Sequence, residues 1–286
     1  MTAAALGLAL GAAAIHATWN LLAKRVGGGV VFVWLFGSFA TIIYAPLATA
    51  TVLLVRPHIG LVHLIFLAGT AVLHLGYFLT LQGGYRSGDL SLVYPLARGT
   101  GPVLSVGAAI LVLGERPTPV AVGGALLIGI GIFLLAGSPT GLDRPGARRA
   151  VGYALLTGAL IAVYTLWDKR AVSTLGIPPI LLDWGGNLGR ALLLTPAALA
   201  RRDEVRALWR EHRREVVLVA VLTPMAYILV LTAMVFTPVS YVAPAREISI
   251  LIGTAMGSRL LAEGEAPRRL AAATAIVVGV AALAVG

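Results

Sequence analysis

Long apolar stretches, separated by short polar connections, follow one another along almost the whole chain. A helix needs about 20 residues to cross a hydrocarbon core of roughly 30 Å, and a backbone in lipid must satisfy its own hydrogen bonds. We therefore predict an all-α integral membrane protein with ten transmembrane helices. The predicted segments are 3–22, 30–55, 61–83, 90–114, 119–137, 150–170, 178–200, 215–236, 239–261 and 269–285.

The pattern occurs twice. Residues 91–98 read SLVYPLAR and residues 240–247 read SYVAPARE, so serine, valine and proline recur at an offset of 149. Each half holds five predicted helices, and because five is odd, the second half re-enters the bilayer with opposite polarity. We therefore predict two inverted repeats, residues 1–140 and 148–286. Such repeats, with a proline-broken helix and buried charge at corresponding places, are typical of secondary transporters.

Composition supports the membrane class and narrows the chemistry. Hydrophobic residues make up 58% of the chain and charged residues 12%, against about 25% charged in soluble domains. There is no cysteine, which excludes disulfides and thiolate metal sites. The chain also lacks the phosphate-loop, zinc-protease and nucleophilic-serine motifs. We expect no enzyme, no cofactor and no metal site.

The basic residues predict a lipid-facing end and not a nucleic-acid surface. The net charge is +10, but most Lys and Arg lie in short connections, six of them within 201–214, where anionic lipid attracts them. The connections after the first, third, fifth, seventh and ninth segments hold fourteen basic residues, against four in the others. By the positive-inside rule, this bias predicts a plasma (inner) membrane protein with both termini on the non-cytoplasmic side.

A charged residue in the fourth segment indicates a functional site. Charge at mid-bilayer costs at least about 2.5–3.5 kcal/mol, so it marks function by default. Arg98 lies eight residues into the segment, roughly 12 Å deep at 1.5 Å per residue. Tyr94 precedes it by four residues on the same face. Pro95 lacks an N–H, so we expect it to open the helix beside the arginine.

The ninth segment carries charge at similar depth, in Arg246 and Glu247. At the repeat offset Glu247 corresponds to Arg98, so a pseudo-twofold axis would bring these opposite charges together. We predict a central ion pair between them. Either substrate or a proton competes for the pair, or the pair is fixed and only holds the two halves in register.

Polar residues also form stripes on otherwise apolar segments, as expected for helices that face a bundle interior. Asp168 and Glu247 are candidates for a proton-titrating group. Asp183, Asn187 and Arg190 form another stripe, which is either a second polar face or a homodimer surface, since Gly185 and Gly189 allow close helix approach. The remaining candidates in the stripes are Trp19, Asn20, His74, Tyr77 and Tyr164.

Five short runs resemble the EamA family of the drug/metabolite transporter superfamily, in the subgroup associated with phosphonate utilisation. They are HATWN at 16–20, HLGY at 74–77, YPLARGTGP at 94–102, SYV at 240–242 and REIS at 246–249. The resemblance covers the whole chain as two EamA repeats. It implies a cavity lined by the first, third, fourth, sixth, eighth and ninth helices, with Trp19, His74, Tyr77, Tyr94, Arg98, Tyr164, Tyr227 and Glu247 around it.

The resemblance has two further implications. It places the seventh helix, with Asp183 and Arg190, at the periphery. Members of the family are usually drawn with both termini cytoplasmic, which differs from the orientation that the loop charges predict.

From these observations we predict a secondary transporter, an exporter or exchanger of a small polar metabolite, working by alternating access. Arg98 and Arg246 would attract an anionic or zwitterionic substrate, and aromatic residues such as Tyr77 and Trp19 would form the walls. The alternative is a non-transporting membrane scaffold or a lipid-modifying intramembrane enzyme.

Overall fold

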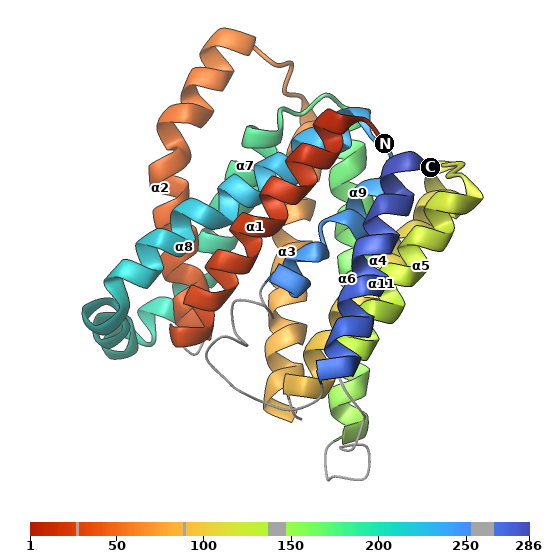
Figure 1. Cartoon of the computed structure of the whole chain (residues 1–286). Helices are drawn as coiled ribbons and strands as arrows, with labels where there is room; N and C mark the ends of the chain where they lie inside the picture. The colour runs from red at the N-terminus through yellow and green to blue at the C-terminus, as the bar shows by residue number, and fades with distance from the viewer. Residues whose placement is uncertain (27–28, 88–89, 137–146, 253–265) are drawn as a thin grey trace.

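The computed structural model describes residues 1–26, 29–87, 90–136, 147–252 and 266–286, and these residues form helices joined by short connections (Figure 1). The helices are α1 (Ala3–Val26), α2 (Val30–Val55), α3 (Leu61–Ser87), α4 (Leu90–Leu113), α5 (Pro119–Ala136), α6 (Ala147–Ser173), α7 (Pro179–Leu199), α8 (Arg202–Phe236), α9 (Val239–Ala245) and α11 (Ala266–Val285).

The helices match the predicted segments closely, with three differences. α8 begins at Arg202, well before residue 215, and bends at His212, whose φ and ψ are −125° and 26°. α9 ends at Ala245, and the chain makes a turn before it becomes helical again over 248–252. α4 continues as one helix through Pro95, so the helix is not broken there, although a proline leaves one carbonyl oxygen of the preceding turn without its N–H donor.

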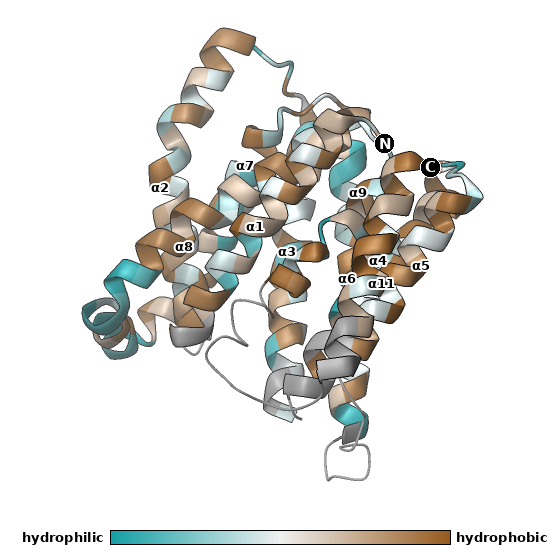
Figure 2. Cartoon of the chain, in the orientation of Figure 1, coloured by the Kyte–Doolittle hydropathy of each residue, from teal (hydrophilic) through white to brown (hydrophobic). Residues whose placement is uncertain are grey.

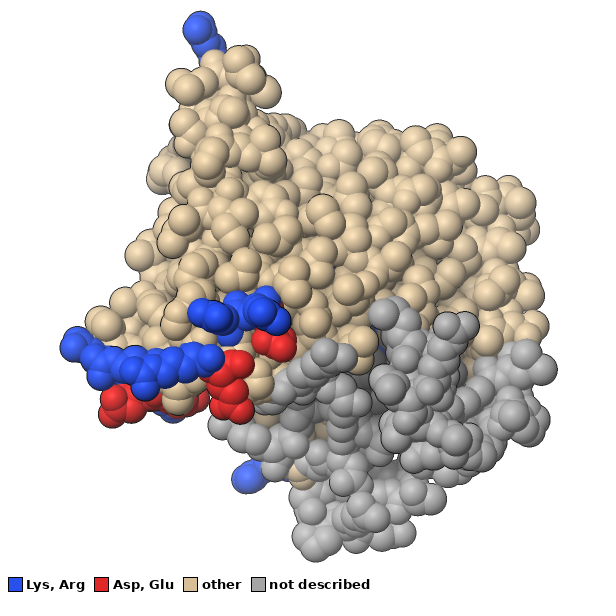
Figure 3. Space-filling view, turned by 60° about the vertical axis from the view of Figure 1, so that its left-hand side comes forward, with Lys and Arg blue, Asp and Glu red and all other residues tan. Residues whose placement is uncertain are grey.

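The surface fits a multi-pass membrane protein. Six described helices, α1, α2, α3, α4, α6 and α8, are long and apolar enough to cross a membrane, and α5 and α11 are shorter apolar helices. Large apolar side chains face outward, with Leu54 83% and Leu111 86% exposed, a pattern that soluble monomers rarely show over large areas. Apolar residues dominate the helices in Figure 2, and Figure 3 shows the charges of one face gathered mainly at the start of α8.

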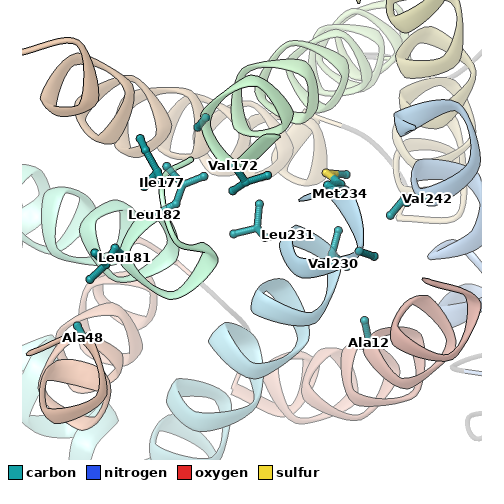
Figure 4. Close-up of a cluster of buried hydrophobic side chains, with 12 residues drawn as sticks. Ala12, Ala48, Val172, Ile177, Leu181, Leu182, Val230, Leu231, Met234 and Val242 are labelled. Carbon is teal, nitrogen blue, oxygen red and sulfur yellow. The ribbon is translucent and has the colours of Figure 1, made fainter. Parts of the chain in front are cut away.

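The helices form two groups with α3 between them (Figure 1). α1, α2, α7 and α8 pack together on one side, and α4, α5, α6, α9 and α11 on the other. The buried cluster in Figure 4 joins α6, α7, α8 and α9 through Val172, Leu182, Leu231 and Val242. This buried apolar cluster therefore joins helices of both groups.

Glycine lets α5 and α11 approach to backbone contact. A Cβ atom at Gly124 would lie 2.6 Å from the carbonyl oxygen of Gly279, and a Cβ atom at Gly279 would lie 2.6 Å from that of Gly124. Side chains at either position would force these helices apart. The two termini meet nearby, where the amino group of Met1 donates to the carbonyl oxygen of Ala284 at 3.4 Å.

Candidate functional site

A cavity of about 80 Å³ lies between the two helix groups. α1, α7 and α8 line it from one group, and α4, α6 and the residue after α9 from the other, with α3 between them. Its wall combines charged, aromatic and small side chains in the middle of apolar helices. The polar and aromatic lining residues are His16, Trp19, His74, Tyr77, Phe78, Arg98, Tyr164, Asp183, Arg190, Thr223, Tyr227 and Arg246.

The predicted central ion pair is confirmed. Arg98 Nη2 lies 2.7 Å from Glu247 Oε2, and both side chains are buried. Arg246 contacts the other carboxylate oxygen, with Nε 3.2 Å from Oε1. The two guanidinium groups line the cavity, whereas Glu247 lies behind them. The cavity wall is therefore cationic here, with its counter-ion set back from the space.

The turn after α9 makes this arrangement possible. On a regular α-helix, neighbours i and i+1 do not face each other, yet Arg246 and Glu247 are in contact. Here the backbone bonds span three residues and not four, from Glu247 N to Pro244 O at 3.0 Å and from Ser249 N to Arg246 O at 3.2 Å. Such bonds tighten the chain locally, and Glu247 can thereby reach Arg98 while Arg246 faces the cavity.

Aromatic rings form the wall next to the arginines. Arg246 Nη2 donates to the Tyr164 hydroxyl at 3.4 Å, and its guanidinium carbon lies 6.0 Å from the centre of that ring. The Tyr164 ring lies 4.3 Å from the His74 ring and 5.8 Å from the Tyr77 ring, between centroids. These rings give the cavity flat apolar surfaces beside its charges.

Asp168 on α6 is the centre of a second buried network. Its Oδ2 atom accepts from the Tyr227 hydroxyl at 2.5 Å and lies 2.9 Å from His74 Nε2. Its Oδ1 atom accepts from the Thr70 hydroxyl at 2.6 Å. Asp168 is fully buried and does not line the cavity, but His74 and Tyr227 do. The Asp168 carboxylate is therefore linked to the cavity by hydrogen bonds to the His74 ring and the Tyr227 hydroxyl.

The peripheral position implied for the seventh helix is wrong. Asp183 and Arg190 on α7 are buried and line the cavity. Asn187 Nδ2 donates to Asp183 Oδ2 at 2.9 Å, and Arg190 Nη2 donates to Asn187 Oδ1 at 2.7 Å. α7 packs against α2 and α3, which turns its polar stripe inward.

Most predicted site residues meet at the cavity, and three do not line it. Asn20 donates to the carbonyl oxygen of His16 on its own helix at 3.0 Å, and Asp168 and Glu247 lie behind the wall. The side chain of Tyr94 falls outside the described part of the chain. The predicted residues that do line the cavity are Trp19, His74, Tyr77, Arg98, Tyr164, Tyr227 and Arg246.

Sequence reasoning did not assign His16, Phe78, Asp183, Arg190 or Thr223 to the site. The spacing of the polar stripe was a usable signal for Asp183 and Arg190. Among the described residues, no group of three or more His, Asp or Glu side chains could hold a metal ion.

Two charged side chains hold the connection between α8 and α9. Lys169 Nζ donates to the carbonyl oxygens of Met234 at 2.6 Å and Thr237 at 3.1 Å. Glu115 accepts from the backbone N–H groups of Val239 at 2.7 Å and Ser240 at 2.9 Å. A cation at a helix C-terminus and a carboxylate at a helix N-terminus both complement the backbone dipoles.

Comparison with known proteins supports the fold alone. No family model matches the chain, and no curated protein matches it by sequence. Among solved structures 29 chains are similar. One, described as "Crystal structure of protein", aligns with a TM-score of 0.78 and 17% sequence identity over 99% of this chain and 96% of that chain.

Proposed function

We propose that the protein is a secondary transporter, an exporter or exchanger of a small anionic or zwitterionic metabolite. The observation that carries this proposal is the cavity lined by Arg98, Arg190 and Arg246 in the middle of apolar helices. Ionised groups at such depth are costly and are retained where they act on a solute. A scaffold would gain little from three guanidinium groups that line a cavity.

The packing of the helices supports alternating access between two inverted repeats. α1 packs along α8 as α6 packs along α3, and two helices of the first half, α2 and α5, pack on their counterparts α7 and α11. This is the pattern expected when a twofold operation exchanges residues 1–140 and 148–286. α1 runs away from the end where the termini lie and α6 runs toward it (Figure 1), as inversion requires. The proposed EamA membership continues to depend on the sequence motifs.

The groups on the wall favour a small substrate with a negative charge. Arg98 and Arg246 share one carboxylate, Glu247, so a substrate anion can replace Glu247 as a partner of either guanidinium. Arg190 adds a third donor, and Asp183 offers a carboxylate to an ammonium group. This combination fits an anion or a zwitterion and disfavours a plain cation. The aromatic rings would cover the apolar part of the substrate.

A ligand screen followed by flux measurement tests this proposal. Purified protein is heated with organophosphonates, amino acids and cationic drugs, because a bound ligand raises the apparent stability. Compounds that stabilise are then tested for saturable uptake into proteoliposomes. We expect anionic or zwitterionic compounds to stabilise the wild type and the exposed control Arg206→Gln, but not Arg98→Gln.

Two results would contradict transport of such a substrate. Stabilisation by cationic drugs alone would exclude the substrate class. No saturable flux for any stabilising compound, with the Arg98→Ala variant folding normally, would favour the scaffold or the lipid-modifying enzyme.

We also propose that both termini lie on the non-cytoplasmic side of the inner membrane. The termini and the basic start of α8, residues 201–214, lie at opposite ends of the molecule (Figure 1). The positive-inside rule places the basic end in the cytoplasm. A reporter that is active only in the cytoplasm, fused after Gly286, should therefore be inactive, and activity would reverse the orientation.

A further inference from the structure

The charges around the cavity balance. Among the described residues, three guanidinium groups line the cavity, those of Arg98, Arg190 and Arg246. Three carboxylates line it or contact the lining. With the histidines neutral and the three carboxyl groups ionised, the site without substrate has no net charge. Binding a monoanion would leave one uncompensated negative charge away from water, which is costly. The carboxylates are Asp168, Asp183 and Glu247.

The three carboxylates differ in their partners. Glu247 contacts two guanidinium groups, at 2.7 Å and 3.2 Å, so a proton there would weaken two ion pairs. Asp183 accepts from the Asn187 amide. Asp168 is held by two hydroxyl groups and the His74 ring, and among the described residues it has no Lys or Arg within ion-pair distance.

The His74–Asp168 pair can accept a proton with little rearrangement. Its atoms already lie 2.9 Å apart, so a proton on the ring would produce an imidazolium–carboxylate ion pair in place. A proton on the carboxyl group would be shared with the same nitrogen. Because His74 lines the cavity, water there can deliver the proton.

We propose that the His74–Asp168 pair takes up one proton for each monoanion that the cavity binds, so that anion and proton cross the membrane together. This inference rests on the proposed transport function. The loaded site is then neutral again, and the direction of net flux follows the combined gradients of anion and proton. A zwitterion without net charge needs no proton.

The charged and titratable groups around the pair line the same cavity and come from α1, α3, α4, α6, α7, α8 and the turn after α9. α1 contributes His16, α7 contributes Asp183 and Arg190, and Arg246 follows α9. α3, α4, α6 and α8 contribute Tyr77, Arg98, Tyr164 and Tyr227. Lys169, next to Asp168 in the chain, is engaged with carbonyl groups of the α8–α9 connection. Variants of Asp183 and Glu247 are therefore needed in the test.

The first experiment needs no substrate. The chain has five histidines, so ¹⁵N-histidine labelling with a His74→Gln reference identifies the His74 signals by NMR. We expect these signals to change as the pH falls from about 8 to about 4, a range that includes the ordinary histidine value of about 6.5, and Asp168→Asn to alter the profile while exposed Asp203→Asn leaves it as in the wild type. His74 signals that are constant over this range, or unaffected by Asp168→Asn, would overturn the inference.

The second experiment counts protons during flux. Methanesulfonate stays ionised at any practical pH and carries no proton itself, whereas taurine is a zwitterion of similar chemistry. In proteoliposomes containing a pH-sensitive dye, we expect methanesulfonate entry to acidify the interior and taurine entry to leave its pH unchanged. In Asp168→Asn the acidification should fall about tenfold or more, within the range of coupling between linked sites, while Asp203→Asn should behave as wild type.

The outcomes separate the two proposals. Methanesulfonate flux without acidification, or acidification that survives Asp168→Asn but not Asp183→Asn or Glu247→Gln, overturns proton coupling at this pair and leaves transport intact. Taurine flux without methanesulfonate flux overturns it as well, because the cavity then rejects net charge. No saturable flux of either sulfonate or of any stabilising metabolite overturns the proposed function. If Asp168→Asn does not fold, His74→Gln takes its place in the flux assay with the same expectation.

Discussion

α4 and α9 begin alike and end differently. In each helix proline is the sixth residue, Pro95 in α4 and Pro244 in α9. α4 continues to Leu113, whereas α9 ends at the residue after its proline. The same proline at the same place in two related segments therefore does not fix the helix end.

The residues that follow the proline account for the difference. In α4 the proline is followed by Leu96, Ala97 and Arg98, with a single charge, and the helix continues. After α9 come two adjacent charges, Arg246 and Glu247, with different partners on the cavity wall and behind it. A regular helix cannot satisfy both, so the chain turns there. Substitutions in the two halves test how these residues decide where each helix ends.

Breaking the ion pair that links the two helices should have the largest effect. Arg98→Ala or Glu247→Ala leaves a buried charge without its partner, which costs about 3–5 kcal/mol. We expect each variant to lose that much free energy of unfolding in detergent, and the exchange Arg98→Glu with Glu247→Arg to recover part of it. An exchange variant as unstable as the single variants would show that the contact does not stabilise the fold.

Arg190→Gln should have the next largest effect and tests the position of α7. The loss of a charged hydrogen-bond donor corresponds to about 1.5–3 kcal/mol, or roughly 10-fold to 150-fold in affinity for an anion. Calorimetric titration with the metabolite that stabilises most strongly measures this change. Exposed Arg210→Gln is the matched control. Equal affinities for the two variants would show that Arg190 on α7 does not contribute to anion binding.

Replacing Pro95 and Pro244 tests the difference between α4 and α9 directly. Pro244→Ala supplies an N–H that can bond to the carbonyl oxygen of Ser240, so α9 should extend and draw Arg246 away from the cavity. We expect affinity to fall about fivefold, equivalent to ~1 kcal/mol for one net hydrogen bond. Pro95→Ala should bind as the wild type does, because α4 is already continuous. Equal effects of both substitutions would contradict a special role for the turn.

The smallest effect is expected for Asn20→Ala. Its side-chain amide bonds to its own helix, and changes away from a functional contact usually stay within about 0.5 kcal/mol. Affinity and the unfolding temperature should therefore match those of the wild type. A tenfold loss of affinity would show that Asn20 contributes to the site.

The helix positions could be predicted because membrane length and apolar composition leave few alternatives. The Arg98–Glu247 contact could be predicted because the repeat offset aligned the two residues. The role of α7 could not, since the spacing of Asp183 and Arg190 defines a helix face but not the neighbour that it meets. Asp168, His74 and Tyr227 were candidates from the sequence, but the contact of Asp168 with Thr70 could not be predicted, because Thr70 is one threonine in an apolar helix and has no distinguishing signal before folding.

The double clasp on the α8–α9 connection constrains how the molecule can move. Lys169 and Glu115 come from different halves, and both hold the same few residues of backbone from opposite ends. Rocking that separates the halves at this end must replace the two bonds that Glu115 accepts with water, whereas the two bonds of Lys169 lie within the second half and stay intact. If the protein is the transporter proposed above, we expect opening at the end that carries the termini to be the slower step of its cycle.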